Sequence, residues 1–144
     1  MNPEARRRLE DLLDREIELA RALALTLADE KTALTGDSPR AVELQAAEKI
    51  RVLATIEKLE EERRALCAAP NSPGIAATVI ERWRALMELM AGCRTANEIN
   101  GHIIHVRQNQ VRQLIDIVRG APAAMTYDPH GKTFAKALRA LARA

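Results

Sequence analysis

The fold is decided by residues 3–34, which read PEARRRLEDLLDREIELARALALTLADEKTAL. Apolar side chains recur there at spacings of three, four and seven residues, namely Leu9, Leu13, Ala20, Leu23 and Leu27, flanked by Leu12 and Leu19. This period places them on one face of an α-helix. Pro3 suits a first helical turn with Asn2 as its cap, and Gly36 is expected to end the helix. Residues 3–34 are therefore predicted to form one long amphipathic helix.

A second helix is expected to begin at Pro39, with Ser38 as its N-cap, and to end before the turn-forming residues 69–74. Its predicted apolar stripe consists of Val42, Ala46, Ile50, Leu53, Ile56, Leu59 and Leu66. Its other face is dense with Glu, Lys and Arg, which is the usual composition of a solvated helix surface.

A third helix is predicted from about residue 75 to residue 119, a stretch without proline. Its stripe consists of Val79, Trp83, Leu86, Met90, Cys93, Asn97, Asn100, Ile104, Val111, Leu114 or Ile115, and Val118. Gly101 is a weak interior position, so a bend is expected there. After a break at Gly120 and Pro122, a turn-rich loop leads to a short amphipathic segment at residues 133–142.

The composition favours an all-α fold. Apolar residues make up 47% of the 144 residues but aromatic residues only 2%, and the apolar mass is Leu and Ala, which favour helices. Short connections force neighbouring helices to be antiparallel. We therefore predict an elongated antiparallel three-helix bundle or coiled coil over residues 1–120, with a long third helix. Residues 121–144 are predicted to form a flexible loop and a short C-terminal amphipathic helix.

The third helix is predicted to be longer than the helices beside it. A turn near residues 71–72 places position i of the second helix opposite about position 143 − i of the third, so Pro39 faces about Ile104. Some fifteen residues, roughly 22 Å, then extend beyond the other helices. This overhang carries Val111, Leu114, Ile115 and Val118, which are unfavourable to leave in water. The chain's own tail, a second copy or a partner protein is expected to cover them.

The sequence gives little support to several other functions. Cys67 and Cys93 have neither disulfide-framework nor metal spacing, and no signal peptide or membrane span is visible, so a cytoplasmic location is expected. Glu98, His102 and His105 share a helix face, but without further ligands they make a weak metal site. We therefore expect no enzyme, no cofactor and no metal. A net charge of +2 is too small to favour nucleic acid, and the tail's apolar face is marginal for a membrane.

Asn97 and Asn100 stand where the stripe of the third helix predicts apolar side chains. An asparagine buried in a coiled-coil seam lowers stability but fixes register. We expect the two amides to form a polar layer bonded to the turn at residues 36–38, with Gly101 allowing close approach of that turn's backbone. The alternative is that these residues bind a partner directly.

Two motifs resemble those of a known family. Residues 93–104, CRTANEINGHII, resemble the central N-x-x-N-G signature of FlgN-type flagellar export chaperones, and residues 126–131, TYDPHG, resemble that family's downstream tyrosine–glycine motif. Lys49 and Trp83 also fit the family's layout. The resemblance implies a cytoplasmic protein that binds the C-terminal helical segments of hook–filament junction proteins. It would keep them unpolymerised and deliver them to the flagellar type III export apparatus.

The resemblance also implies roles for individual residues. A C-terminal tyrosine docks on the cytosolic domain of the export gate in that family, and Tyr127 is the only tyrosine here. Cargo helices would lie in a groove against the overhang and the tail. The predicted cargo-binding residues are Val111, Leu114, Ile115, Val118, Phe134, Leu138 and Leu141. Two alternatives stay open: a structural coiled-coil adaptor that homodimerises through the overhang and has no export role, and a metal-binding bundle.

Overall fold

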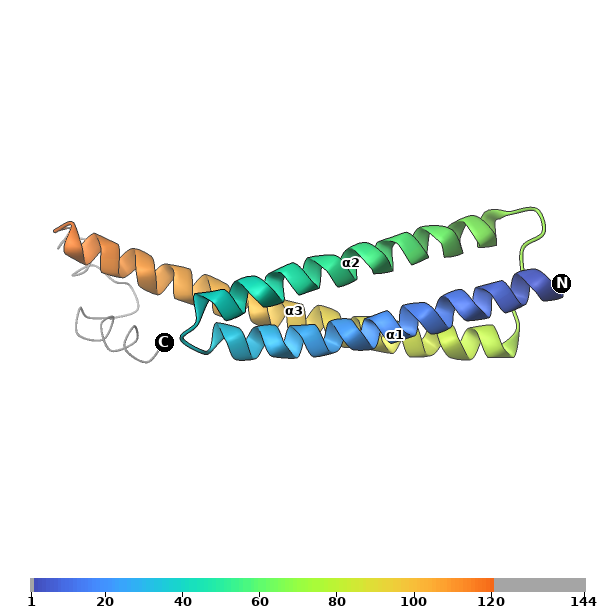
Figure 1. The fold of residues 1–144 in the computed structure, drawn as a ribbon, viewed down its shortest axis with the longest axis horizontal. Helices are drawn as coiled ribbons and strands as arrows, with labels where there is room; N and C mark the ends of the chain where they lie inside the picture. Colours follow the sequence, from blue (N-terminus) through green and yellow to red (C-terminus); the bar gives the residue numbers. More distant parts are fainter. Residues whose placement is uncertain (1, 121–144) are drawn as a thin grey trace, which may run out of the picture.

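The computed structural model describes residues 2–120, which form three long helices joined by two connections (Figure 1). Helix α1 spans Pro3–Leu34, α2 spans Pro39–Ala68 and α3 spans Ala77–Val118. The all-α fold class is confirmed, and the predicted boundaries agree to within about two residues. The helix predicted at residues 133–142 lies outside the described part of the chain. None of the three described helices is both long and apolar enough to cross a membrane.

Local sequence explains where the helices begin and end. The side chain of Asn2 accepts hydrogen bonds from two backbone N–H groups of the first turn of α1, and Ser38 Oγ accepts one from the first turn of α2. Proline follows each cap, in a turn where its missing N–H is not needed. Gly74 and Gly120, with φ of 71° and 72°, supply the left-handed conformations that follow α2 and α3.

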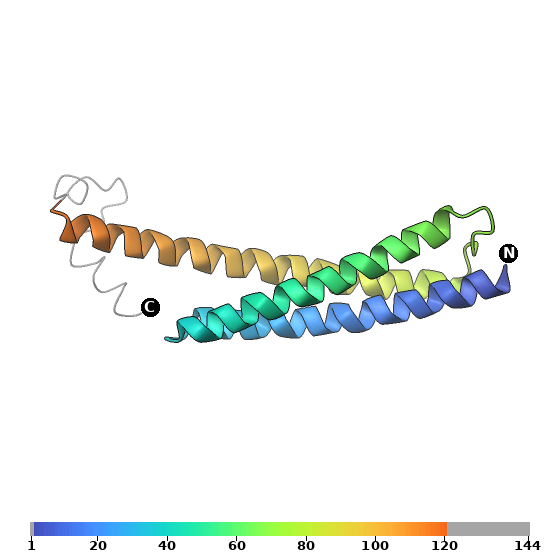
Figure 2. The same ribbon diagram turned by 45° about the horizontal axis from the view of Figure 1, so that its top comes forward.

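Helix α1 is the central element of the bundle. It runs antiparallel to α2 and parallel to α3, and it packs along both (Figures 1 and 2). Helix α2 crosses obliquely and meets α3 mainly through long side chains. Because α1 has neighbours on two sides, thirteen of its residues are buried, against three in each of the other helices.

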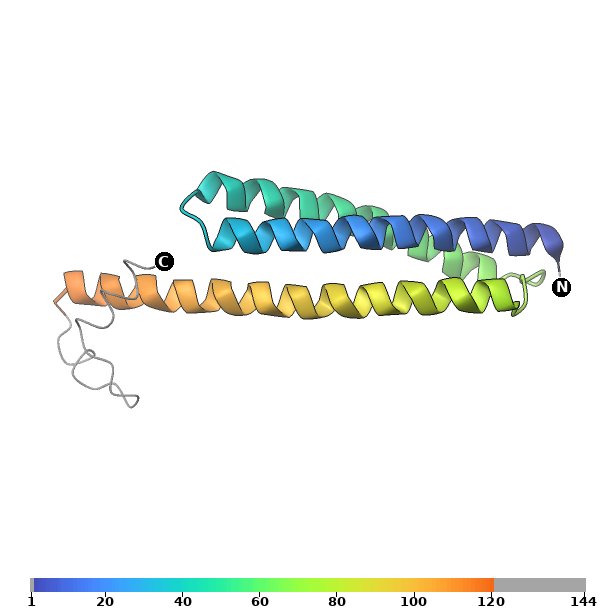
Figure 3. The ribbon, with the colours of Figure 1, turned by 90° about the horizontal axis from the view of Figure 1, so that it is seen from below.

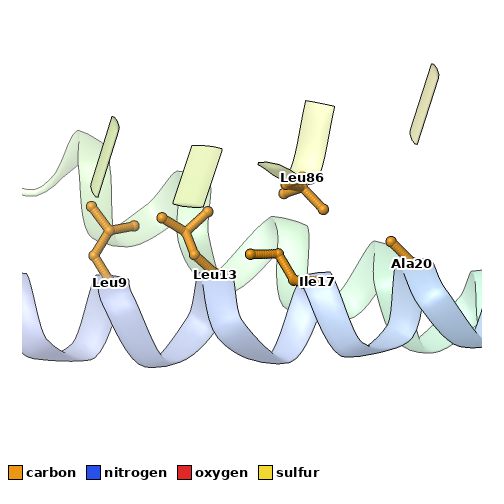
Figure 4. Packing of buried hydrophobic residues seen from close by; sticks show 5 residues of the cluster. All are labelled: Leu9, Leu13, Ile17, Ala20 and Leu86. Atoms are coloured by element: carbon orange, nitrogen blue, oxygen red, sulfur yellow. The ribbon is translucent and has the colours of Figure 1, made fainter. Parts of the chain in front are cut away.

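The core consists of two apolar clusters along α1. The first is formed by Leu9, Leu13, Ile17, Ala20 and Leu86, and fills the space between α1 and α3 (Figure 4). The second joins all three helices through Leu23, Leu27, Val52, Ile56 and Cys93. The five residues predicted for the stripe of the first helix are all buried. Burial of each such Leu or Ile stabilises the fold by about 1.5–3 kcal/mol.

The predicted stripe of the second helix is right at Ile56 and Leu59, which are buried, but wrong at Ile50 and Leu53, which are exposed. Ile50 is 67% exposed, whereas Val52, which the prediction left out, is 1% exposed. The side chains that face the bundle at spacings of three and four are Lys49, Val52, Ile56, Leu59 and Arg63. Because two of these inward-facing positions are basic, a stripe drawn through apolar residues alone leaves them out and includes the exposed Ile50 instead.

The two cysteines are far from forming a disulfide. Cys67 is exposed near the end of α2, whereas Cys93 is buried in the middle of α3, and both are free. The Cys93 thiol lies 3.5 Å from the carbonyl oxygen of Ala20, and burial raises the pKa of this thiol. The expectation that the two thiols do not pair is confirmed.

Candidate functional site

The end of α3 extends beyond both other helices (Figure 3). Arg107 Nη2 donates to the carbonyl oxygen of Gly36 at 3.2 Å, which marks the level at which α1 turns into α2. Helix α3 continues from Arg107 to Val118, roughly 16 Å. The predicted overhang is therefore present, but it is about one helical turn shorter than expected.

The shorter overhang follows from the register of α2 and α3. Lys49 meets Asn97, and Arg63 lies against Trp83, so paired positions sum to 146 rather than 143. The connection after α2 continues to residue 76 instead of turning tightly at residues 71–72. The longer connection moves α3 back along α2 by about three residues.

A groove of about 1060 Å³ opens where the overhang passes the α1–α2 corner. One wall is α3 and the other is the start of α2, with the corner between them. Its lining residues are Leu34, Gly36, Asp37, Ser38, Pro39, Val42, Glu43, Ile104, Arg107, Gln108, Val111, Arg112 and Ile115. Apolar side chains from all three helices thus meet in a groove that also carries both signs of charge.

The groove contains part of the predicted cargo-binding set. Val111 and Ile115 line it and are 50% and 42% exposed. Leu114 is half-buried and Val118 is exposed, but neither lines the groove. The other predicted contacts, Phe134, Leu138, Leu141 and the docking residue Tyr127, lie outside the described residues. Sequence reasoning missed Leu34 and Val42, because their contribution depends on how the α1–α2 corner meets α3.

A buried polar layer lies about one turn from the groove. Asn100, which is 1% exposed, donates from Nδ2 to the carbonyl oxygen of Leu27 and to Glu30 Oε1, both at 2.9 Å. Lys49 Nζ lies 2.8 Å from Glu30 Oε2 and 3.3 Å from Asn97 Oδ1. This layer joins all three helices and holds α3 at the base of its overhang.

The expected partners of the two asparagines are wrong. Their amides bond Glu30, Lys49 and the Leu27 carbonyl, not the turn at residues 36–38. The expected close approach at Gly101 is also wrong, because a Cβ added there would meet nothing within 4 Å. The sequence did contain a sign of the true partner. Glu30 lies three residues after Leu27 and four before Leu34, so it falls on the buried face of α1.

A second polar layer lies farther from the groove and also joins three helices. Arg63 Nε donates to Glu16 Oε2 at 2.8 Å, and the Arg63 guanidinium lies 4.7 Å from the centre of the Trp83 ring. The Glu16 side chain is 3% exposed. Burial raises the pKa of this carboxyl, against the opposing effect of the hydrogen bond from Arg63.

The metal-binding alternative finds no geometric support. Among residues 2–120, no three His, Cys, Asp or Glu side chains lie together as a group that could hold a metal ion. The His105 ring instead lies 3.3 Å from the Asn109 amide nitrogen. Glu98 and His102 therefore do not complete a site with His105.

Comparison with known proteins identifies the family. The sequence profile of the FlgN protein family matches residues 1–134. The chain belongs to the FlgN protein family. The match includes the N-x-x-N-G run, whose two asparagines are the α3 members of the polar layer: Asn100 is buried in it, and Asn97 lies at its exposed edge.

Curated relatives carry the same family name. A protein named "Flagella synthesis protein FlgN" from Yersinia enterocolitica (serotype O:8 / biotype 1B) is 28% identical over 133 residues, covering 86% of this chain and 88% of the relative. Its namesake from Salmonella typhimurium (strain LT2) is 26% identical over 128 residues, covering 88% and 90%. No solved structure matches the chain significantly. Family membership and the names of these relatives support a role in flagellar assembly.

Proposed function

We propose that this FlgN-family chain is a cytoplasmic export chaperone that acts by binding and catalyses no reaction. Its cargo would be the C-terminal helical segments of hook–filament junction proteins. The observation that carries the proposal is the groove beside the overhang, where α3 extends past its helical neighbours and still carries apolar side chains. An amphipathic cargo helix laid there would replace the missing neighbour.

The dimensions of the groove fit one helix of about three turns. Ile104 and Ile115 lie eleven residues apart on α3, which corresponds to roughly 16 Å of helix. Because Val111 and Ile115 are already about half covered, covering the rest would contribute about 1 kcal/mol for each side chain. Glu43 and Arg112 also line the groove and offer one charge of each sign to polar residues of the cargo. A cargo helix held in this way cannot present its apolar face to other copies of itself.

Delivery to the export apparatus is the second part of the proposal. Tyr127 would dock on the cytosolic domain of the export gate, as the family resemblance implies. Phe134, Leu138 and Leu141 would add contacts to cargo from the tail. The spacing of these three residues, four and then three, puts them on one face if the segment is helical.

The test is calorimetric titration with the C-terminal fragment of a hook–filament junction protein from the same genome. Val111→Asp places a charge in the groove and is expected to weaken binding at least about tenfold, or 1.4 kcal/mol. Val106→Asp is the matched control, because Val106 is 40% exposed on the same helix but does not line the groove. This control should bind the fragment like the unchanged protein, and both variants should keep their helical circular dichroism.

Two results would contradict the proposal. Equal loss of binding in both variants would show that the added charge acts without regard to the groove. Absence of fragment binding, together with a dimer that Val111→Asp dissociates in size-exclusion chromatography, would instead favour the homodimeric coiled-coil adaptor.

A further inference from the structure

We propose that the chain's own C-terminal segment, residues 133–142, occupies the groove when cargo is absent. Its displacement by cargo is a second step, which rests on the function proposed above. The argument uses the length of the groove, the apolar pattern of the segment and the distribution of charge.

The segment has the length that the groove requires. Ten helical residues span about 15 Å, and the groove extends roughly 16 Å from Ile104 to Ile115. Helix α3 ends at Val118, only three residues beyond Ile115, so the remaining chain starts beside the groove. Residues 119–132 can span up to about 46 Å when extended, which is ample to reverse direction and return along α3. An antiparallel arrangement with α3 is therefore within reach.

The apolar pattern of the segment matches a groove with apolar walls. Phe134, Leu138 and Leu141 fall on one face of a helix, and Lys136 falls on the opposite face. Val111 and Ile115 are likewise four residues apart on α3 and half-exposed. Seating the segment in the groove would remove both apolar sets from water together, which a free tail and an empty groove cannot do.

Charge favours the side of the groove formed by the α1–α2 corner. Residues 121–144 contain one acidic and four basic residues. Asp37 and Glu43 line the groove, and Asp29 joins Asp37 in an adjoining hollow of about 340 Å³. Arg107 and Arg112 lie on the α3 side, so the basic face of the segment is drawn toward the corner and away from α3.

Self-occupancy has a consequence for cargo. A groove that is filled for nine-tenths of the time binds any other helix about tenfold more weakly than an empty one. The apolar face of the tail cannot contact the groove and cargo at once. Cargo that enters the groove therefore releases residues 133–142, and their apolar face becomes available to cover the cargo helix from its other side.

Pulsed electron spin resonance on the full-length chain tests this placement. Nitroxide labels are attached at Gln108→Cys, a neutral and exposed residue that lines the groove, and at Ala144→Cys, just beyond the segment, so that every charge used in the argument stays in place. Cys67→Ser removes the exposed native thiol, while buried Cys93 stays unlabelled. Labelled protein is diluted with unlabelled protein, so that only intramolecular distances are measured. The expected result is one narrow, short distance distribution.

A matched pair of variants decides between outcomes. Leu138→Asp should make the distribution broad and longer, whereas Ala140→Asp, which adds the same charge away from the apolar face, should leave it narrow. A broad distribution in the parent protein, or equal behaviour of the two variants, overturns the proposal. A short distance that disappears on dilution with unlabelled protein assigns the groove to the tail of a second copy and also overturns it.

Adding the cargo fragment separates this inference from the proposed function. Lengthening of the label distance at saturating fragment supports displacement of the tail. If the distance changes in Leu138→Asp but not when the fragment binds, the tail occupies the groove but cargo does not displace it, and the displacement step is overturned. If the fragment fails to bind at all while the response to Leu138→Asp persists, the cargo proposal fails and self-occupancy stands.

Discussion

Asn100 is the buried amide that ties α3 to α1 at the base of the overhang. Its Nδ2 donates to the Leu27 carbonyl and to Glu30, so Asn100→Ala leaves the Glu30 carboxylate short of a donor in a buried setting. We expect a loss of about 1–3 kcal/mol in the free energy of unfolding, measured by urea denaturation. Asn97→Ala is the control, because Asn97 is exposed and should cost less than about 0.5 kcal/mol. Equal losses would contradict the assigned role.

Glu16 should give stability a recognisable pH dependence. Its folded pKa is raised above 4.5, chiefly by burial, so the folded state binds this proton more tightly than the unfolded state. Its contribution is therefore fully present below about pH 4.5 and is lost as the pH rises through the folded pKa. Position 16 does not titrate in Glu16→Gln. The free energy of unfolding of this variant, relative to that of the parent protein, should therefore increase as the pH rises through this range. The measurement is urea denaturation at a series of pH values.

The control for this pH dependence is Glu18→Gln, which removes an exposed carboxyl from the same helix. Its difference from the parent protein, measured over the same pH series, is the baseline with which that of Glu16→Gln is compared. If the parent protein instead becomes more stable relative to Glu16→Gln as the pH rises, attraction to Arg63 outweighs the effect of burial on the pKa of Glu16.

Charged core residues mark the limit of what the sequence predicts at this scale. Apolar positions such as Leu13 and Leu27 follow from spacing alone, since only a helix aligns them. Glu16 and Glu30 do not, because a carboxylate is normally assigned to the surface unless its buried partner is known. The partners lie on α2, whose alignment with α1 is a tertiary fact.

At the scale of the helices, the two polar layers fix how α2 lies on α1. Glu16 pairs with Arg63, and Glu30 pairs with Lys49, so both pairs specify the same antiparallel register. Within each helix the paired residues are fourteen positions apart, or two heptads. A slip of one heptad would place Glu16 opposite Ile56 and leave a buried charge without its partner, which is strongly unfavourable. Leucine-rich helices alone would not distinguish these registers.

Glycine in the middle of α3 provides a test of the N-x-x-N-G motif. Gly101 has ordinary helical geometry, and a methyl group added there would meet open space, so Gly101→Ala should stabilise the fold by about 0.5–1 kcal/mol in thermal or urea denaturation. Gly92→Ala should behave alike, whereas Gly120→Ala should destabilise, because φ there is +72°. Loss of cargo affinity in a stabilised Gly101→Ala protein would favour a direct binding role for the motif.

At the scale of the whole molecule, the sequence predicts the three helices of residues 2–120, their ends to within about two residues and the existence of an overhang. It does not predict that α1 is central, because the choice among three amphipathic helices depends on which has the widest buried face. The sequence pattern also assigns all four predicted overhang residues to one cargo-binding set. The structure separates Val111 and Ile115, which face the α1–α2 corner, from Leu114 and Val118, which do not line the groove.

Cargo binding and delivery should be separable, because they are assigned to different parts of the chain. Tyr127 follows α3 and precedes residues 133–142, and a tyrosine offers a large contact area with little entropy to lose. We expect Tyr127→Ala to leave unfolding and cargo affinity unchanged but to weaken binding to the gate's cytosolic domain by about 2 kcal/mol or more. Tyr127→Phe tests the hydroxyl alone, and His130→Ala is the control. Equal loss in the cargo and gate titrations, or a large fall in melting temperature, would show that Tyr127 packs against the bundle instead.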